Sequence, residues 1–289
     1  MAGMVEGTPG LRVVMPVARL AVLGSPIAHS LSPALHRAAY AVLGLDWAYD
    51  AVDVDREHLA EFVSSRDAEW RGLSLTMPLK KDILPMLTDI TELARETGSA
   101  NTVLFEPDGP RGFNTDVYGI TQGFTRHGRH SLGAVLILGG GATAASALVA
   151  AARLGARRVF VGVRSPERAT ALVGVGRAQG IDVQFRTLDQ LEQIDEALDA
   201  VISTLPNGAA VSVSIDPDVV QNAALFDVAY SPWPTPLAAS WTGDTVIGGL
   251  EMLVLQALAQ VRIFVAGDAD QPLDRDDEVL ASMLAAAGL

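Results

Sequence analysis

Residues 131–152 carry no charged side chain, and three consecutive glycines, Gly139 to Gly141, lie near their centre. Such a stretch is long enough to cross a membrane as one helix. Glycine is unfavourable inside a helix, however, and Thr143 and Ser146 place hydroxyl groups after the glycines. The pattern therefore predicts a buried strand, a tight turn and a buried helix instead of a membrane span.

This strand–turn–helix unit begins a regular alternation of strands and helices. Residues 165–180 are typical of a helix, and strand-like apolar runs cover residues 157–164, 182–186, 198–206, 223–230 and 244–249. Repeated alternation of this kind is typical of a parallel sheet with helices on both faces. We therefore expect such a sheet in the second half of the chain.

The first part of the chain is typical of a separate α/β unit. Strands are expected at 20–24, 47–55 and 71–77, and helices at 32–45, at 58–66 and after Pro78. Residues 99–116 alternate like a hairpin around Asp108-Gly109, a favoured turn sequence. The segment from Gly249 onward is helical in pattern and adds no strands, so we expect it to pack back onto this first unit.

Composition narrows the classes of partner. The chain has 289 residues, 49% of them apolar, which is enough for two cores of ordinary size. A formal net charge of −13 disfavours nucleic acid and anionic membrane surfaces. The absence of cysteine excludes disulfides and thiolate metal sites and favours the cytoplasm. The apolar stretch Val13 to Gly24 is broken by Pro16 and Arg19, so we expect no signal peptide.

The glycine turn has the spacing of a dinucleotide-binding fingerprint, Gly139-x-Gly141-x-x-Ala144, between a strand and a helix. In that setting the first glycine makes the turn, and the second lets the backbone approach a pyrophosphate. The small third residue lets the helix pack close to the strand, and the N–H groups at the helix start face the phosphates. A tight connection without a ligand would use the same glycines, so the motif alone is weak evidence.

The end of the next strand favours NADP over NAD. An NAD protein usually carries an acid there for the ribose hydroxyls, whereas this chain has Val163-Arg164-Ser165 and no acid before Glu167. Arg164, and Arg168 one turn later, are suited to a 2′-phosphate. The alternative is that both arginines are ordinary surface charges.

Two charged residues stand where helices are expected to begin. Lys80 falls in the first turn of the helix expected after Pro78, where the helix dipole and burial disfavour an ammonium group. Such a lysine is suited to proton exchange near neutral pH. Asp116 lies at the start of another expected helix. The alternatives are a solvated Lys80–Lys81 pair and a simple helix cap at Asp116.

Uncharged polar residues also mark candidate positions. Asn101 lies in a strand-like run, and Gln256 lies on an otherwise apolar helix, where a buried amide needs partners unless it faces solvent. Ser30 and Ser32 precede Pro33, which fits the first position of a helix. Ser32 is placed to cap that helix, which leaves Ser30 without a structural role.

The order of these motifs resembles the shikimate dehydrogenase family over nearly the whole chain. The motifs are GSPIAHSLSPALH, LSLTMPLK, GSANTV, GFNTDVYG, LILGGGATAAS, STLPNG, DVAYSPWPTPL and GLEMLVLQALAQ. As a set they are highly specific, because unrelated dinucleotide-binding proteins share only the glycine turn. The resemblance implies NADPH-dependent reduction of 3-dehydroshikimate to shikimate, in aromatic amino-acid biosynthesis.

The resemblance also implies a role for each matching residue. Lys80 and Asp116 match the catalytic pair. The carboxylate of the substrate would be bound by Ser30, Ser32 and Tyr230, and its ring hydroxyls by Thr76, Asn101 and Gln256. The residues that match the NADP site are Gly139, Gly140, Gly141, Ala142, Thr143, Arg164, Ser165 and Arg168. The family's chemistry needs no metal.

The implied architecture is two α/β domains with a cleft between them. A discontinuous substrate-binding domain would comprise residues 1–117 plus 247–289, and a Rossmann-type NADP-binding domain with a parallel sheet would comprise residues 118–246. Two departures from the family pattern occur. Ser74 replaces the usual asparagine two residues before Thr76, and the turn reads Gly-Gly-Gly-Ala instead of Gly-Ala-Gly-Gly. Neither departure removes a reacting group.

Two other functions fit parts of the pattern. The nearer is a quinate or dual quinate/shikimate dehydrogenase using NAD(P), against which Arg164 and the Ser-x-Ser pair argue. The other is a non-catalytic NADP- or shikimate-binding sensor, which would not need the Lys80–Asp116 pair that this chain retains. We expect a small-molecule substrate, no nucleic-acid or membrane partner, a cytoplasmic location, and a monomer or homodimer.

Overall fold

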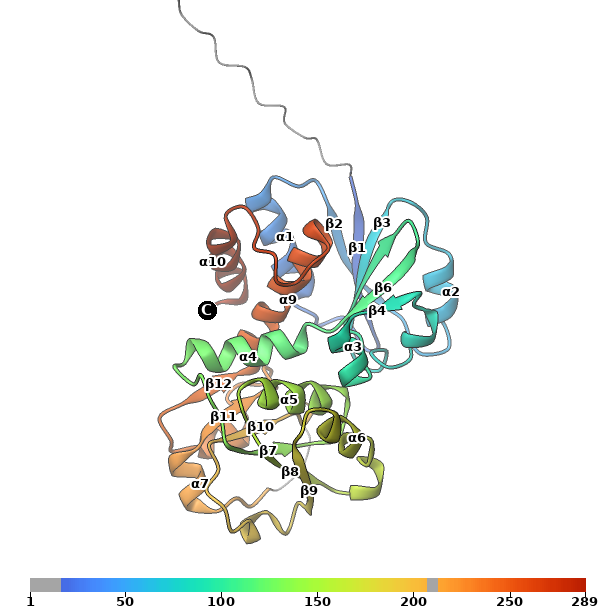
Figure 1. Ribbon diagram of the computed structural model, residues 1–289. Coiled ribbons are helices and arrows are strands. Elements are labelled where there is room, and N and C mark those ends of the chain that lie inside the picture. The colour runs from blue at the N-terminus through green and yellow to red at the C-terminus, as the bar shows by residue number, and fades with distance from the viewer. Residues whose placement is uncertain (1–16, 207–212) are drawn as a thin grey trace, which may run out of the picture.

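The computed structural model describes residues 17–206 and 213–289. Asn207 and Gly208 of the STLPNG motif, and the part of the apolar N-terminal stretch before Val17, lie outside the described residues. The fold is α/β, as expected, with two six-stranded sheets that each carry their own helices (Figure 1). Helices α4 (Asp116–Arg126) and α9 (Gly249–Ala266) pack against each other where the two halves meet (Figure 1).

The first sheet has the strand order β2-β1-β3-β5-β6-β4. Its strands are β1 (Arg19–Gly24), β2 (Ala48–Asp53), β3 (Trp70–Leu75), β4 (Asp89–Ile90), β5 (Thr102–Glu106) and β6 (Gly109–Phe113). Strands β1, β2 and β3 are parallel, whereas β5 and β6 form an antiparallel hairpin. Gly109 follows the turn with φ of 117°, a backbone conformation that favours glycine. The expected hairpin around Asp108-Gly109 is confirmed.

Helices cover both faces of this first sheet. They are α1 (Ser32–Leu43), α2 (Leu59–Ser64), α3 (Glu92–Thr97), the long α9 and α10 (Asp276–Ala287). Side chains alternate along a strand, so Leu20 and Val22 of β1 pack with residues of α1, α9 and α10. Ala21 and Leu23 point the other way and pack with residues of α2 and α3. The C-terminal helices therefore pack back onto the first unit, as the sequence predicts.

The second sheet has the order β12-β11-β10-β7-β8-β9, and all neighbouring strands are parallel. Its strands are β7 (Ala134–Leu138), β8 (Arg158–Val163), β9 (Asp182–Thr187), β10 (Ala200–Ser203), β11 (Ala224–Asp227) and β12 (Val246–Gly248). Its helices are α5 (Ala142–Arg153), α6 (Ala171–Ala178), α7 (Pro217–Asn222) and α8 (Pro236–Ser240). The predicted parallel sheet is confirmed. The single helix expected over 165–180 is wrong in part, because a short 3-10 turn precedes α6.

Residues 131–152 form β7, the glycine turn and most of α5, so the predicted strand, turn and helix are confirmed. Within the two described ranges, one helix, α9, is long and apolar enough to cross a membrane by length and composition, and α5 is too short. In this fold 72% of α9 is buried, since it packs between α4 and the first sheet.

The segment after Pro78 is not the helix that the sequence predicts. Residues 77–83 form turns, and a short 3-10 helix follows at Leu84–Met86. The carbonyl of Lys80 accepts a hydrogen bond from the backbone N–H of Ala100 at 2.8 Å, so it is not engaged in a helical bond. The helix-dipole argument for Lys80 is therefore wrong, and tertiary contacts must set the environment of its side chain.

Candidate active site

A cavity of about 330 Å³ is lined by residues from both halves of the molecule. Its lining includes all eight residues that the resemblance assigns to catalysis or substrate binding: Ser30, Ser32, Thr76, Lys80, Asn101, Asp116, Tyr230 and Gln256. Of the residues expected to bind the cofactor, all of which are described, Thr143 alone reaches the lining. The fold thus gathers residues from β1, β3, α4, α9 and the loop after β11 around one space.

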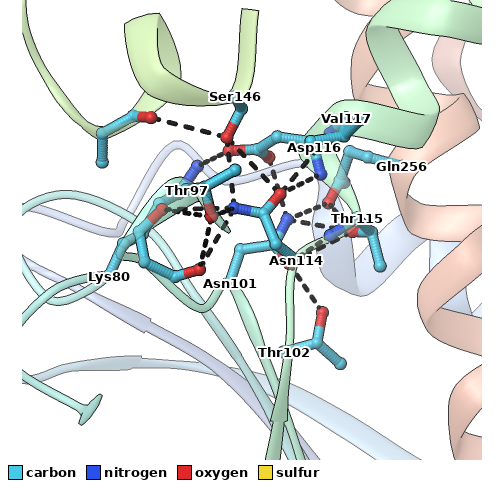
Figure 2. Close-up of polar contacts among 12 residues, drawn as sticks. Lys80, Thr97, Asn101, Thr102, Asn114, Thr115, Asp116, Val117, Ser146 and Gln256 are labelled. Atoms are coloured by element: carbon cyan, nitrogen blue, oxygen red, sulfur yellow. Dashed lines mark hydrogen bonds and ion pairs between the residues drawn. The ribbon is translucent and has the colours of Figure 1, made fainter. Parts of the chain in front are cut away.

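Lys80 and Asp116 form an ion pair in this cavity (Figure 2). Lys80 Nζ lies 2.6 Å from Asp116 Oδ2, and the two side chains are 15% and 4% exposed. Charges at this distance and this degree of burial interact more strongly than a solvated surface pair. Lys80 is therefore not part of a solvated Lys80–Lys81 pair. The contact between Lys80 and Asp116, which no sequence pattern shows, is present.

Asn101 fixes the other oxygen of the Asp116 carboxylate (Figure 2). Its Nδ2 donates to Asp116 Oδ1 at 2.8 Å and to Thr115 Oγ1 at 2.9 Å. Its Oδ1 accepts from the backbone N–H of Thr115 and from the hydroxyl of Thr102, each at 2.9 Å. Because these partners define which end of the amide is which, Asn101 orients the carboxylate so that Oδ2 faces Lys80.

The N-terminus of α4 is capped by Asn114, and not by Asp116. Asn114 Oδ1 accepts from the backbone N–H groups of Asp116 at 3.0 Å and Val117 at 3.4 Å. Its Nδ2 donates to Thr97 Oγ1 at 2.9 Å and to Ser146 Oγ of α5 at 3.1 Å (Figure 2). The reading of Asp116 as a simple cap is therefore wrong, and its carboxylate is free to meet Lys80 and Asn101.

The two serines at the start of α1 do not divide the capping and binding roles as the sequence predicts. Helix α1 begins at Ser32, after Leu31 at the N-cap position, and among the described residues the Ser32 hydroxyl forms no hydrogen bond. Instead, Ser30 Oγ accepts from the backbone N–H of Ser32 at 3.3 Å. Both serines line the cavity. Ser30 can therefore contact a ligand as well as accept from the backbone of α1, whereas Ser32 can contact a ligand but does not cap the helix.

Gln256 presents part of its amide to the cavity. Its Nε2 donates to the carbonyl of Leu253 at 2.8 Å, and its Oε1 lies 3.4 Å from Asn101 Nδ2 and 3.3 Å from Thr115 Oγ1. One Nε2 hydrogen remains for a ligand, because a primary amide has two. Tyr230 also lines the cavity, and burial raises the pKa of its phenol, which keeps the hydroxyl protonated and able to donate.

Gln260, one helical turn after Gln256, also lines the cavity and was not singled out from the sequence. Ser74 is another lining residue, and its hydroxyl accepts from Tyr49 at 2.6 Å and donates to Gln260 at 2.9 Å. The serine that departs from the family pattern therefore uses its hydroxyl proton and one of its two lone pairs within the protein. The signal for Gln260 was its spacing: two glutamines four residues apart share one face of an otherwise apolar helix.

Behind Gln260 lies a fully buried histidine. His36 Nε2 is 3.2 Å from Gln260 Oε1, and its ring stacks on Tyr49 with ring centroids 3.9 Å apart. Burial lowers the pKa of His36 from 6.5 to about 3. The imidazole is therefore neutral at physiological pH.

The depressed pKa of His36 predicts an acid-sensitive fold. The unfolded chain binds a proton at His36 between about pH 6.5 and pH 3 and the folded chain does not, so stability falls as pH falls through that window. The free energy of unfolding should drop by about 2 kcal/mol from this group between pH 7 and pH 5. Urea titrations at both pH values check this. His36→Gln should remove this part of the pH-dependent loss of stability. His130→Gln, a control at an exposed position, should retain it. The prediction would be contradicted if the wild type and His36→Gln lost the same free energy of unfolding between pH 7 and pH 5.

The glycine turn has the geometry that a pyrophosphate site needs. Gly139 has φ of 110°, and a side-chain carbon there would lie 2.5 Å from Thr204 Oγ1. A carbon added at Gly141 would meet nothing within 4 Å, so the backbone at the start of α5 faces open space. Ala144 is completely buried against the second sheet. The first N–H groups of α5 have no partner within the helix and are available to an anion.

Arg164 and Arg168 lie beside this turn. Arg164 directly follows β8, whose last residue, Val163, packs next to Gly140. Both arginines are exposed, and among the described residues neither guanidinium forms a hydrogen bond or an ion pair. Ser165 begins the 3-10 turn that carries Arg168. Two unpaired cations next to an open helix start suit a phosphorylated ligand.

Comparisons with known proteins identify the family. Residues 22–103 match the family model described as the shikimate dehydrogenase substrate binding domain. The chain is 34% identical to the shikimate dehydrogenase (NADP(+)) of Citrifermentans bemidjiense over 279 residues, 92% of this chain and 96% of that protein.

Solved structures of shikimate dehydrogenases are similar to this chain along nearly its whole length. The crystal structure of Mycobacterium tuberculosis shikimate dehydrogenase is 35% identical, with a TM-score of 0.80 over 93% of this chain and 99% of that one. Thermus thermophilus shikimate 5-dehydrogenase in complex with NADP(H) and shikimate is 28% identical, with a TM-score of 0.77 over 93% and 99% of the two chains. The fold, the cavity and these relatives together show that this chain belongs to the shikimate dehydrogenase family.

Proposed function

We propose that this protein reduces 3-dehydroshikimate to shikimate with NADPH. The observation that carries the proposal is the Lys80–Asp116 pair, held at 2.6 Å inside a cavity lined by hydroxyl and amide groups. A ligand-binding sensor on the same fold would not need a buried acid–base pair. The named relatives are NADP-dependent enzymes, which supports the same activity.

Lys80 is proposed as the proton donor. When bound, NADPH supplies the hydride that reduces the ketone carbon. As charge develops on the ketone oxygen, Lys80 Nζ donates a proton to it and is left neutral. Asp116, whose Oδ2 accepts from Nζ, holds the lysine in place and stabilises its protonated form, which returns when a proton is taken up from solvent.

Substrate recognition is proposed for the remaining lining residues. Ser30, Ser32 and the phenol of Tyr230 offer hydroxyl donors for the carboxylate of the substrate. Thr76, Asn101 and Gln256 line the same cavity and are proposed for the ring hydroxyls, Asn101 in exchange for its bond to Thr115 Oγ1. The open N–H of Gln256 is the clearest unused donor among them.

The nucleotide site fits NADP. Gly139, Gly140, Gly141, Ala142 and Thr143 would hold the pyrophosphate against the start of α5, where open space is present at Gly141. Arg164, Ser165 and Arg168 would hold the 2′-phosphate, because both arginines are exposed and unpaired among the described residues. These residues form the edge of a proposed NADP-binding domain over 118–246, opposite a substrate-binding domain of residues 1–117 and 247–289.

We also propose a cytoplasmic enzyme that works as a monomer or homodimer on a small molecule, without a metal, a nucleic acid or a membrane. The lack of cysteine and the acidic net charge support this setting.

The function is tested by comparing substrates and cofactors. Shikimate and quinate should each be oxidised with NADP and with NAD, and kcat/KM measured for the four combinations. We expect shikimate with NADP to exceed every other pair by at least about tenfold, because quinate carries an extra hydroxyl and NAD leaves Arg164 unpaired. A preference for quinate would establish the dual-enzyme alternative. Binding of NADPH or shikimate without turnover would establish the sensor.

Ser30→Ala is expected to raise KM for 3-dehydroshikimate about tenfold, since a hydroxyl donor to a carboxylate is lost. Because Ser30 also accepts from the N–H of Ser32, we expect an additional loss of about 1 kcal/mol in stability. Ser32→Ala should raise KM with a smaller loss of stability. Steady-state kinetics and thermal unfolding check both variants. An unchanged KM in Ser30→Ala would remove its role in binding.

A further inference from the structure

Gln260 joins the buried histidine to the catalytic groups. It is 2% exposed, lies on α9 and is one of the residues that line the cavity. Its Nε2 lies 3.2 Å from the backbone carbonyl of Asn101 and 3.0 Å from Thr102 Oγ1. Its Oε1 lies 2.9 Å from Ser74 Oγ and 3.2 Å from His36 Nε2.

The direction of each of these hydrogen bonds follows from its partners. A backbone carbonyl can only accept, so the end of Gln260 that faces Asn101 is the donating Nε2. Oε1 must then accept, so His36 carries its proton on Nε2, and its Nδ1 accepts from the Tyr40 hydroxyl at 3.2 Å. The network closes without two donors or two acceptors facing each other.

All of the hydrogen-bonding capacity of Gln260 is used in this network. Its two N–H bonds go to Asn101 and Thr102, and its two lone pairs accept from Ser74 and His36. Although Gln260 lines the cavity, no group on it remains for a ligand. In this respect it differs from Gln256, which keeps one free N–H.

The hydrogen bond between Gln260 and Thr102 connects the Gln260 amide, through Asn101, to Asp116 of the catalytic pair. Because Thr102 Oγ1 accepts from Gln260, its own proton is directed to Asn101 Oδ1 at 2.9 Å. That bond, with the N–H of Thr115, keeps Asn101 Nδ2 turned toward Asp116 Oδ1. If the amide of Asn101 turned over, two oxygens would face each other at Asp116.

We propose that Gln260 is a positioning residue for the reaction, acting through Thr102 and Asn101 to hold Asp116 toward Lys80. This inference rests on the proposed function, since it concerns the same site. His36 is the fixed neutral donor that orients the Gln260 amide from behind.

A double-mutant cycle tests the proposal. Gln260→Met should lower kcat/KM for 3-dehydroshikimate about tenfold, the scale of a misplaced catalytic group, with KM for NADPH unchanged. In an Asn101→Ala background the same change should lower kcat/KM less than about twofold, because the residue through which Gln260 acts is gone. Gln221→Met, at an exposed position on α7, is the matched control and should change neither. Equal effects of Gln260→Met in both backgrounds would show a general structural role and overturn the proposal.

Thr102→Val covers the case in which Gln260→Met does not fold. It removes the relaying hydroxyl and leaves Gln260 bonded to the Asn101 carbonyl, so it should lower kcat/KM while the protein remains folded. The side-chain amide NMR signal of Asn101, assigned by its loss in Asn101→Ala, should shift in Thr102→Val and stay in place in Gln221→Met. An unshifted signal in Thr102→Val would overturn the proposal, even if the wild type failed to reduce 3-dehydroshikimate and the proposed function fell.

Discussion

Lys80→Ala is expected to lower kcat with 3-dehydroshikimate and NADPH at least about 100-fold, the usual scale for one general acid. The ketone oxygen loses its proton donor, and Asp116 is left 4% exposed without the cation that it pairs with. KM for NADPH should change little, because Lys80 belongs to the first unit and the proposed NADP residues belong to the second.

Lys81→Ala is the matched control for this variant. Lys81 adjoins Lys80, is exposed and is absent from the cavity lining, so its removal should leave kcat within about twofold of wild type, as is usual for surface substitutions. Steady-state kinetics at saturating substrate compares the two, and circular dichroism confirms that both are folded. A Lys80→Ala enzyme with wild-type kcat would remove Lys80 from the mechanism.

Arg164→Ala is expected to raise KM for NADPH about 10- to 100-fold and KM for NADH less than about twofold. Hydrogen bonds between a guanidinium and a phosphate are strong and are made with the 2′-phosphate, which NADH lacks. Arg164 forms no other ion pair among the described residues, so its loss should not disturb the fold.

Arg177→Ala removes a second exposed arginine of the same unit, on α6, and serves as the control for net charge. It should leave both KM values within about twofold of wild type. Steady-state kinetics with each cofactor measures the ratio of the two KM values. If Arg164→Ala weakened NADPH and NADH equally, the assignment of Arg164 to the 2′-phosphate would be contradicted.

The parts of the fold that follow from local patterns were predictable. The strand, glycine turn and helix over 131–152 and the hairpin at Asp108-Gly109 depend on neighbouring residues, and both are confirmed. The helix expected after Pro78 does not form, because this segment is shaped by contacts with residues distant in sequence. The carbonyl of Lys80 bonds to Ala100, which is distant in sequence, and a local pattern carries no information about that bond.

In the candidate site too, the geometry depends on contacts between residues that are distant in sequence. The resemblance named residues that line the cavity, but it gave no geometry. The 2.6 Å contact between Lys80 and Asp116 joins residues 36 positions apart, and the bond between His36 and Gln260 joins residues 224 positions apart. Capping at Asn114 instead of Asp116 also depended on tertiary structure, because Asn114 is held by Thr97 and Ser146.

The most direct measurement is the oxidation of NADPH by the purified protein when 3-dehydroshikimate is added, with the product identified by chromatography. One shikimate should form for each NADPH consumed, and Lys80→Ala should abolish most of this turnover. No oxidation of NADPH at saturating concentrations of both compounds would contradict the proposed function.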